Sequence, residues 1–471
     1  ARTASPTYRQ SLNDADPAEV SLRAARAGLF PTLSTSGGVG YTGAGRSTFG
    51  GSFFNQSSPA LSSSYSIGAE WSISAATLMA PKQSKAELRA TEENIAAAKV
   101  SLDADVTTQY LTALRAVASV EVAEQQVKRN QEFLDIAKAR FEVGRANLID
   151  VRQAEVTKAQ GDVQLLRARQ AAVEAKIELL RRIGVPAGAI VDSLVLTEAF
   201  PLSAPSWELG DLKRLALEAN PSLKALEARR EAATIGVRSA KSAYLPSFQI
   251  STGLRGFTQQ FTDESVLINN ALGSAVGSAN NCRFQNGILE RLTSPHPAPN
   301  GGIIADCNSF AGLDATGAAL DPQIRQAILD RNSVFPFNFS RQPWSISLGI
   351  SLPIWDGFQR STRISQARAQ EDDARESLRA RKLELDGAIQ GRLAGVRTAF
   401  EAARIQDVNR TAAREQLQLA QDRYRLGSGT ALEVADAQNA VTRAEVDYVS
   451  AVYDYHLAVV ALEASVGRPL R

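Results

Sequence analysis

The 471-residue sequence has few cysteines and histidines, the residues that most often act as nucleophiles and metal ligands. It contains two cysteines, one methionine and two histidines, and His296 and His456 are far apart in the sequence. No GxSxG, HExxH or P-loop motif stands out. This composition argues against nucleophilic, metal or nucleotide chemistry, so we expect a protein that is not an enzyme and that needs no cofactor and no metal.

An excess of charge and long apolar runs are missing too. Lys and Arg (52) nearly balance Asp and Glu (50), which argues against a nucleic-acid-binding surface. No run of about 18 apolar residues is present, so no transmembrane helix is predicted. No signal peptide is visible, but the helical stretch before Pro221 has almost no counterpart before Pro6. We therefore expect that residue 1 is not the start of the translated chain.

What the sequence does contain is an internal duplication. The segment from Arg140 to Pro186 realigns without a gap on the segment from Arg423 to Pro469, 283 residues later. A second pair of landmarks, Leu29-Phe30-Pro31 and Tyr244-Leu245-Pro246, matches at a shift of 215, so the second copy holds a long insertion. Repeated units of helix and strand favour a symmetric assembly over a single catalytic pocket.

Five segments are rich in strong helix formers and are predicted to be helices: 82–142, 148–183, 208–243, 360–426 and 431–466. The fourth is roughly 100 Å long at 1.5 Å per residue. The last has a heptad seam of large residues (Val434, Val441, Tyr448, Tyr455, Leu462) and alanines (Ala437, Ala444, Ala451, Ala458), and 148–183 keeps the small row (Ala154, Gly161, Ala168, Ala175). Taken alone, these helices would fit a soluble coiled coil as well as any other assembly of long helices.

Four segments alternate apolar with small or polar residues and are predicted to be strands: 32–41, 65–74, 247–255 and 344–354. One such strand would suit the half-buried sheet of a soluble protein, but four, placed as two hairpins between long helices, favour a membrane β-barrel. Four strands cannot close a barrel, and open edges in lipid would leave backbone groups unpaired. Two, three or four copies of the chain must therefore share one barrel.

The remaining segments are predicted to be connections. Stretches 43–64 and 256–343 are expected to be loops that join the strands of each pair. The second loop holds Cys282 and Cys307, for which we predict a disulfide worth roughly 3 kcal/mol in an oxidising compartment; the alternative is two free thiols. Gly144 and Gly427 each separate two helices, as in a tight helical hairpin.

The ordered duplication of these motifs resembles the TolC family of outer-membrane factors, the outer membrane efflux proteins. The resemblance is carried by R-[FY]-x-[VL]-G at 140–144 and 423–427, by Leu148-Ile149-Asp150-Val151, by Leu432-Glu433-Val434 and by the stretch 352–357. It implies a fold that mixes a membrane β-barrel with an α-helical barrel. Each protomer of a homotrimer would give four strands to a shared twelve-stranded barrel and long coiled helices to a periplasmic tunnel.

The resemblance also implies a function and partners. The protein would lie in the outer membrane, extend into the periplasm and act as the passive exit duct of a tripartite export system. Its partners would be a periplasmic adaptor protein, an inner-membrane transporter of the RND or ABC type and outer membrane lipid, with no nucleic acid. Small-molecule efflux is favoured. The alternatives are a type I protein secretion duct and, in a different class, a periplasmic coiled-coil scaffold without a pore.

Three groups of residues receive roles from the resemblance. Glu433 and Asp436 would form an acidic ring at the periplasmic entrance, because carboxylate rings select cations; the alternative is two solvated acids. Asp150 and Tyr424 would close the entrance, although Gly429 stands where the family places a cation. Adaptor contacts are predicted at the tips, with plain hairpin geometry as the alternative; these residues are Phe141, Gly144, Leu148, Tyr424, Gly427 and Leu432.

The predicted domain organisation follows the duplication. Residues 1–28 form the helical, equatorial start of repeat 1, 29–76 the first outer-membrane β-hairpin, 77–185 the first long helical hairpin and 186–207 an equatorial linker. Residues 208–245 form a helix of repeat 2, 246–354 the second β-hairpin with a long extracellular insertion, and 355–471 the second long helical hairpin.

Overall fold

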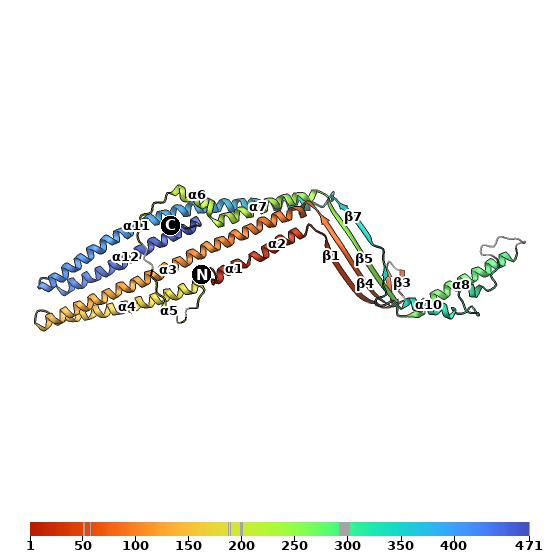
Figure 1. The fold of residues 1–471 in the computed structure, drawn as a ribbon, viewed down its shortest axis with the longest axis horizontal. Coiled ribbons are helices and arrows are strands. Elements are labelled where there is room, and N and C mark those ends of the chain that lie inside the picture. Colours follow the sequence, from red (N-terminus) through yellow and green to blue (C-terminus); the bar gives the residue numbers. More distant parts are fainter. Residues whose placement is uncertain are drawn as a thin grey trace. The chain divides into compact units, whose positions relative to one another are not determined.

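The computed structural model describes residues 1–49, 52–56, 58–186, 188, 190–197, 201–291 and 302–470, so His296 lies outside the described residues. The chain divides into two compact units (Figure 1). The helical unit comprises Ala1–Ala27, Ala75–Tyr244 and Ile354–Arg471. The strand unit comprises Gly28–Ser74 and Leu245–Pro353.

Two long helical hairpins dominate the helical unit. The first is α3 (Ala75–Glu142) with α4 (Leu148–Ile183), and the second is α11 (Gln359–Leu426) with α12 (Ala431–Val466). Both first helices have 68 residues and both second helices have 36, so the duplication seen in the sequence is confirmed as two hairpins of equal length. Figure 1 shows the two helices of each hairpin side by side.

The two hairpins also end alike. Gly184 after α4 and Gly467 after α12 both have φ of +88°, and each is pressed against the start of its own copy. A Cβ on Gly184 would lie 2.3 Å from the Ala4 carbonyl oxygen, and one on Gly467 would lie 2.9 Å from Asn220 Cα. Only glycine fits such close approaches at positive φ.

Shorter helices complete the helical unit: α1 (Pro6–Asn13), α2 (Ala15–Ala27), α5 (Ile190–Ser193), α6 (Leu209–Ala219), α7 (Pro221–Lys241) and the 3₁₀ turn η1 (Ser242–Tyr244). The continuous helix predicted for 208–243 is wrong, because the chain breaks between α6 and α7. Pro221 forces Asn220 into an extended conformation with ψ of 114°, and Asn220 Oδ1 accepts a hydrogen bond from Leu223 N at 3.1 Å. Asn220 thereby caps a new helix that begins with proline.

The strand unit holds an antiparallel sheet in the order β1 (Thr32–Thr42), β4 (Ala60–Ile73), β5 (Ser247–Phe261) and β7 (Ser345–Ser351). The short β6 (Ser340–Arg341) also pairs with β5. Within the described residues, β1 pairs only with β4 and β7 pairs only with β5. The sheet of a single chain therefore has two open edges.

The two faces of this sheet differ in polarity. On one face, neighbouring strands are joined by polar side chains: Ser36 to Ser66 at 2.8 Å, Ser251 to Ser347 at 2.6 Å, and Gln249 Nε2 donating to Glu70 Oε1 at 2.6 Å. The other face carries apolar side chains, which the register places next to one another across the strands. Many of them are exposed, among them Leu33, Ile67, Leu254, Ile346, Leu348 and Ile350.

The segments between the strands are more ordered than expected. Stretch 43–64 contains the hairpin of β2 (Gly45–Phe49) and β3 (Ser52–Gln56) and the beginning of β4. Stretch 256–343 begins with the end of β5 and then forms α8 (Glu264–Leu289), α9 (Cys307–Phe310) and α10 (Pro322–Asn332). The last predicted strand is shorter than expected and ends at Ser351, since Pro353 has no N–H for a sheet.

The insertion has a small core of its own. Ala275 and Ala279 of α8 pack against Leu313 and Leu320, which are themselves joined by an isolated β-bridge. A disulfide links the buried Cys282 and Cys307, whose Cα atoms are 5.7 Å apart. The insertion is thus a disulfide-linked helical element and not the loop that the sequence suggested.

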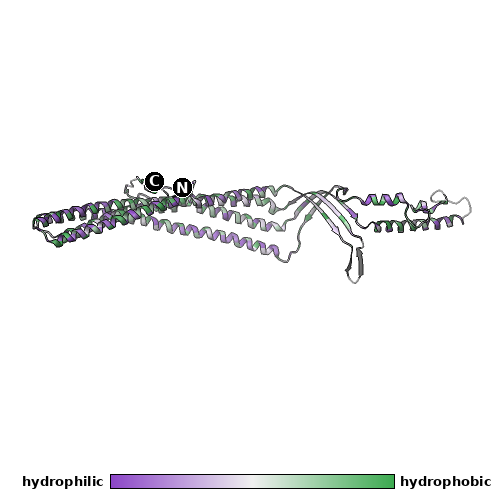
Figure 2. Cartoon of the chain, turned by 90° about the horizontal axis from the view of Figure 1, so that it is seen from below, coloured by the Kyte–Doolittle hydropathy of each residue, from purple (hydrophilic) through white to green (hydrophobic). Residues whose placement is uncertain are grey.

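Across the described ranges, none of the helices combines the length with the apolar character that a bilayer crossing needs. Figure 2 shows hydrophilic and hydrophobic residues interspersed along the long helices.

Candidate functional site at the helical tips

The two hairpin turns are built by the same backbone bonds. We call residues 140–151 tip 1 and residues 423–434 tip 2. Gly144 N donates to Phe141 O at 2.9 Å, and Gly427 N donates to Tyr424 O at 3.1 Å. The residue after each glycine donates to the arginine five residues back, at 2.8 and 2.9 Å. Gly144 and Gly427 have φ of +71° and +82°, so both turns are αL caps that require glycine.

An arginine closes each turn from its side chain. Arg140 Nη2 donates to Arg145 O at 3.2 Å, and Arg423 Nη2 donates to Ser428 O at 3.3 Å. Each guanidinium thus bonds to a carbonyl of the turn that follows its own helix. We had not assigned these arginines a role from the sequence, although each is the first residue of the R-[FY]-x-[VL]-G motif.

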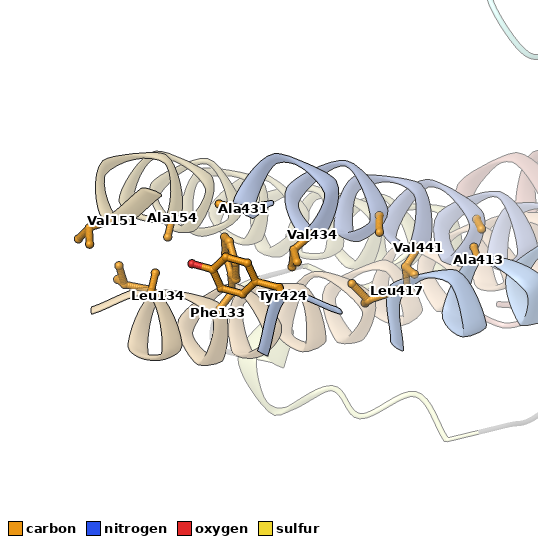
Figure 3. Packing of buried hydrophobic residues seen from close by; sticks show 13 residues of the cluster. Phe133, Leu134, Val151, Ala154, Ala413, Leu417, Tyr424, Ala431, Val434 and Val441 are labelled. Atoms are coloured by element: carbon orange, nitrogen blue, oxygen red, sulfur yellow. The ribbon is translucent and has the colours of Figure 1, made fainter. Parts of the chain in front are cut away.

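The two tips pack into one apolar cluster (Figure 3). Figure 3 shows Tyr424 beside Phe133, and the two ring centroids are 5.6 Å apart. The Arg140 guanidinium lies 4.4 Å from the centre of the Tyr424 ring, and its Nη1 donates to the Tyr424 carbonyl oxygen. Arg140 therefore joins tip 1 to tip 2 through a cation–π contact and a hydrogen bond.

Of the predicted closing pair, Tyr424 lies in this cluster, and Asp150 is near enough for its charge to act on Tyr424 without a hydrogen bond between them. Tyr424 is 3% exposed, and its hydroxyl has no hydrogen-bond partner in the described part of the chain. Burial raises the pKa of Tyr424, and the charge of Asp150 raises it further, whereas Arg140 lowers it. Asp150 Oδ2 instead accepts from Asn147 N at 3.1 Å, which caps the start of α4.

The two predicted entrance acids have different surroundings. Glu433 Oε2 lies 3.7 Å from Arg423 Nη1, and both side chains are about half exposed. A Cβ on Gly429 would lie 3.1 Å from Arg423 Cβ and from Glu433 Oε2, so a side chain at residue 429 would be crowded by Arg423, which itself brings positive charge to this place. Asp436 is exposed and makes no ion pair with any described residue. No group of three or more potential metal ligands occurs in the ranges described.

The tips expose apolar side chains. Of the predicted adaptor-contacting residues, Phe141 is 44% exposed, Leu148 52% and Leu432 59%. Three neighbours that belong to the shared motifs but not to the predicted contact set are more exposed still, at 68% for Val143, 77% for Ile149 and 85% for Leu426. Val143 and Leu426 are 283 residues apart and so occupy the same position in the two copies. This shared position is the sequence signal that could have marked both as tip residues.

Farther up the hairpins, a buried charge cluster joins three helices. Glu445 of α12 accepts from Arg129 Nη2 of α3 at 3.0 Å and from Arg414 Nε and Nη2 of α11 at 3.1 and 3.0 Å. The Glu445 side chain is 8% exposed. Beside it, Gln438 Nε2 donates to the Arg129 carbonyl oxygen at 3.3 Å. This cluster holds the second hairpin against the first.

Comparison with known proteins identifies the class. The family model described as "Outer membrane efflux protein" matches residues 1–185 and 308–468, so the chain belongs to this family of outer-membrane channels. The family confirms the resemblance and the outer-membrane localisation. The predicted fold class, a β domain combined with an α-helical barrel domain, is confirmed by solved outer-membrane channels.

Particular relatives share parts of the chain. The fusaric acid resistance protein FusA of Burkholderia cepacia is 27% identical over 178 residues, 37% of this chain and 33% of FusA. The toluene efflux pump outer membrane protein TtgF of Pseudomonas putida is 32% identical over 174 residues, 35% of each chain. The match thus spans about a third of these relatives' length.

Among solved structures, the outer membrane protein VceC of Vibrio cholerae matches with a TM-score of 0.70. The match covers 100% of this chain and 95% of VceC at 16% sequence identity. At this identity the likeness is one of fold.

Proposed function

We propose that this chain is one protomer of a homotrimeric exit duct, through which a tripartite system exports substrates across the outer membrane. The observation that carries the proposal is the antiparallel sheet of β1, β4, β5 and β7, with the short β6, whose edges at β1 and β7 are open within the described residues. In lipid, unpaired edge groups cost several kcal/mol each, so β7 of one copy must pair with β1 of the next. Three copies give twelve strands, enough to enclose a channel.

The polarity of the sheet supports this arrangement. A barrel in a membrane turns its apolar face to lipid and its polar face to the lumen. The face with Leu33, Ile67 and Leu348 would meet the acyl chains, and the hydrogen-bonded serines of the opposite face would line the pore.

The tips supply an entrance on the periplasmic side. Glu433 and Asp436 would recur three times around the trimer axis and form a cation-selective ring. Arg140, Asp150 and Tyr424 would hold the two hairpins together in the closed state. The exposed apolar residues of the tips, such as Phe141, Leu148 and Leu432, would contact a periplasmic adaptor protein, with Gly144 and Gly427 shaping the turns.

The partner and the cargo follow from the class. Since we see no nucleotide-binding motif in the chain, the energy would come from an inner-membrane transporter of the RND or ABC type. Two relatives are named for fusaric acid and for toluene, both small organic molecules. We therefore place small-molecule efflux ahead of type I protein secretion.

Purification in detergent, followed by recording in planar bilayers, tests the proposal. We expect a particle with the mass of three chains that conducts and is blocked by millimolar divalent cations. Glu433→Ala combined with Asp436→Ala should raise the conductance and weaken the block. The matched control, Asp372→Ala with Glu376→Ala, removes two exposed acids of α11 that are far from the tips in the sequence. It should change neither the conductance nor the divalent block.

Two results would contradict this reading. A monomer that is stable without detergent would remove the shared barrel, and with it the duct. A conducting trimer in which both double variants keep the same divalent block would leave the duct in place but would remove the acidic ring.

A further inference from the structure

The helices that lead into the strands carry unbalanced positive charge. The ends of α2, α3, α7 and α11 nearest the strands are residues 20–27, 75–86, 232–241 and 359–370, and none of these stretches contains Asp or Glu. Seven of their Lys and Arg residues are exposed and make no ion pair within the described residues. We call them the junction belt: Arg26, Lys82, Lys85, Arg238, Lys241, Arg363 and Arg368.

Within the described part of the chain, the belt cations lack the ion pairs that several other cations on the same helices make. Two other arginines of these stretches are neutralised, Arg23 by Glu19 at 2.9 Å and Arg360 by Asp356 at 2.8 Å. Farther along α11, Arg375, Arg379 and Arg381 each pair with a carboxylate. The whole chain has a formal charge of only +2, so the belt is a local excess that the remainder of the molecule balances.

Part of the belt lines a groove between α3 and α7. The groove has a volume of about 820 Å³ and is walled by Lys82 and Lys85 from one helix and by Arg230 and Arg238 from the other. Its two acids are engaged, since Glu231 lies 4.0 Å from Arg89 and Glu227 lies 3.7 Å from Lys382. The floor is apolar, formed by Ala86, Ala228 and Ile235. Cationic walls over an apolar floor suit an anion attached to an apolar body.

The stretches that carry the belt adjoin the strands in the sequence. α3 begins two residues after β4 ends, and β5 begins three residues after η1 ends. At 1.5 Å per residue, Lys82 and Lys85 lie within about 20 Å along the helix from the point where the chain leaves β4. Basic residues close to a bilayer surface are attracted to its anionic headgroups.

We propose that the junction belt binds the anionic headgroups of phospholipids in the leaflet nearest the helical unit, and that the groove between α3 and α7 holds one phosphodiester headgroup. The inference rests on the proposed function, because it needs strands that span the membrane. It adds a lipid-recognition site on the helical unit to that function.

Such a site can be tested with the full-length protein in nanodiscs of phosphatidylethanolamine that contain 30% phosphatidylglycerol, a composition chosen for the test. Native mass spectrometry counts the phosphatidylglycerol and phosphatidylethanolamine molecules that stay bound after release from the nanodisc. The belt variant carries Gln at Lys82, Lys85, Arg238 and Lys241. The matched control carries Gln at four exposed cations outside the four stretches that also lack ion pairs among the described residues: Lys99, Lys128, Arg167 and Arg443.

Wild type and control should retain phosphatidylglycerol in preference to phosphatidylethanolamine, and the belt variant should lose this preference about ten-fold or more. Each basic residue near a headgroup layer is worth about a five-fold change in binding. An unchanged preference in the belt variant would overturn the inference. So would an equal loss in the control, which would show only a general effect of charge.

A planar-bilayer recording separates this inference from the proposed function. If the belt variant conducts as a trimer with an altered reversal potential and an unaltered lipid preference, the belt lines the conduit and the inference is wrong. If wild type forms no conducting trimer, the proposed function itself fails, and this is seen before any lipid is counted. Glycerol phosphate at 10 mM that displaces the bound lipid equally in wild type and belt variant would also overturn the site.

Discussion

Burial decides how strongly a charged contact holds the two hairpins together, and two contacts between the same helices allow a direct test. Glu445 of α12 bonds to Arg129 of α3 with side chains that are 8% and 19% exposed. Nine residues farther along α12, Asp454 bonds to Arg115 of α3 at 3.2 Å with side chains that are 56% and 36% exposed. The two contacts join the same two helices, but Glu445 is far less accessible to water than Asp454 and also bonds to Arg414.

Glu445→Gln should destabilise the protein far more than Asp454→Asn. Removing one partner of a buried pair leaves an uncompensated charge and costs about 3–5 kcal/mol. Because Arg414 is 54% exposed and regains water, we expect the lower end, about 3 kcal/mol. An exposed pair contributes about 0–1 kcal/mol. The difference corresponds to roughly a hundred-fold change in the unfolding equilibrium.

Urea unfolding, followed by the helical circular dichroism signal at one protein concentration in one detergent, measures both variants. The midpoint should fall clearly for Glu445→Gln and barely for Asp454→Asn. High salt should reduce the small effect and leave the large one, since buried pairs are screened less. Equal shifts for the two variants would refute the reasoning that burial sets the strength of these contacts.

Three further predictions concern the tips and the insertion. Tyr424→Phe should keep or raise stability in thermal melts, because a buried hydroxyl without a partner costs about 1–3 kcal/mol. Since burial raises the pKa of Tyr424, wild type should lose more stability than the variant as the pH rises past about 10. A destabilised variant would show that the hydroxyl is bonded. Cys282→Ser combined with Cys307→Ser should speed proteolysis of the insertion, because the insertion loses roughly 3 kcal/mol of local stability. The melting temperature of the long helices should stay unchanged, and a lower value would contradict this prediction. Gly144→Val combined with Gly427→Val should abolish efflux with trimers intact, because each substitution forces a β-branched residue to positive φ at a cost of about 1–3 kcal/mol. The control Gly391→Val, in the middle of α11, should leave efflux unchanged. Wild-type drug resistance in the tip variant would exclude the tips as the docking surface.

Repetition made the helical hairpins predictable. Because the second copy keeps step with the first, weak local signals at Gly144 and Gly427 reinforced one another, and the observed helix ends near the tips fall where the pattern put them. The strands were equally visible, since alternation with period two is a strong signal. The break at Asn220 was missed because the apolar pattern continues through Pro221, although proline at a helix start is a local signal.

The insertion and the charge cluster could not be read from the sequence. α8 is rich in Asn, Gly and Ser, which are weak helix formers, and its helicity depends on packing against Leu313 and Leu320 and on the disulfide. Glu445, Arg129 and Arg414 are separated by up to 316 residues, so nothing local marks them as partners. The same holds for Arg140, whose contact with Tyr424 bridges 284 residues.

The open edges of β1 and β7 have a consequence for biogenesis. A solitary copy would meet the bilayer with an apolar sheet face and two rows of unsatisfied amides and carbonyls, a state that neither water nor lipid tolerates well. On the proposed trimer, insertion and association are therefore a single event, and its rate should rise steeply with the number of nascent chains. At low expression, chains that find no partners would be degraded by periplasmic proteases. The number of assembled trimers would therefore rise more than linearly with the rate of synthesis.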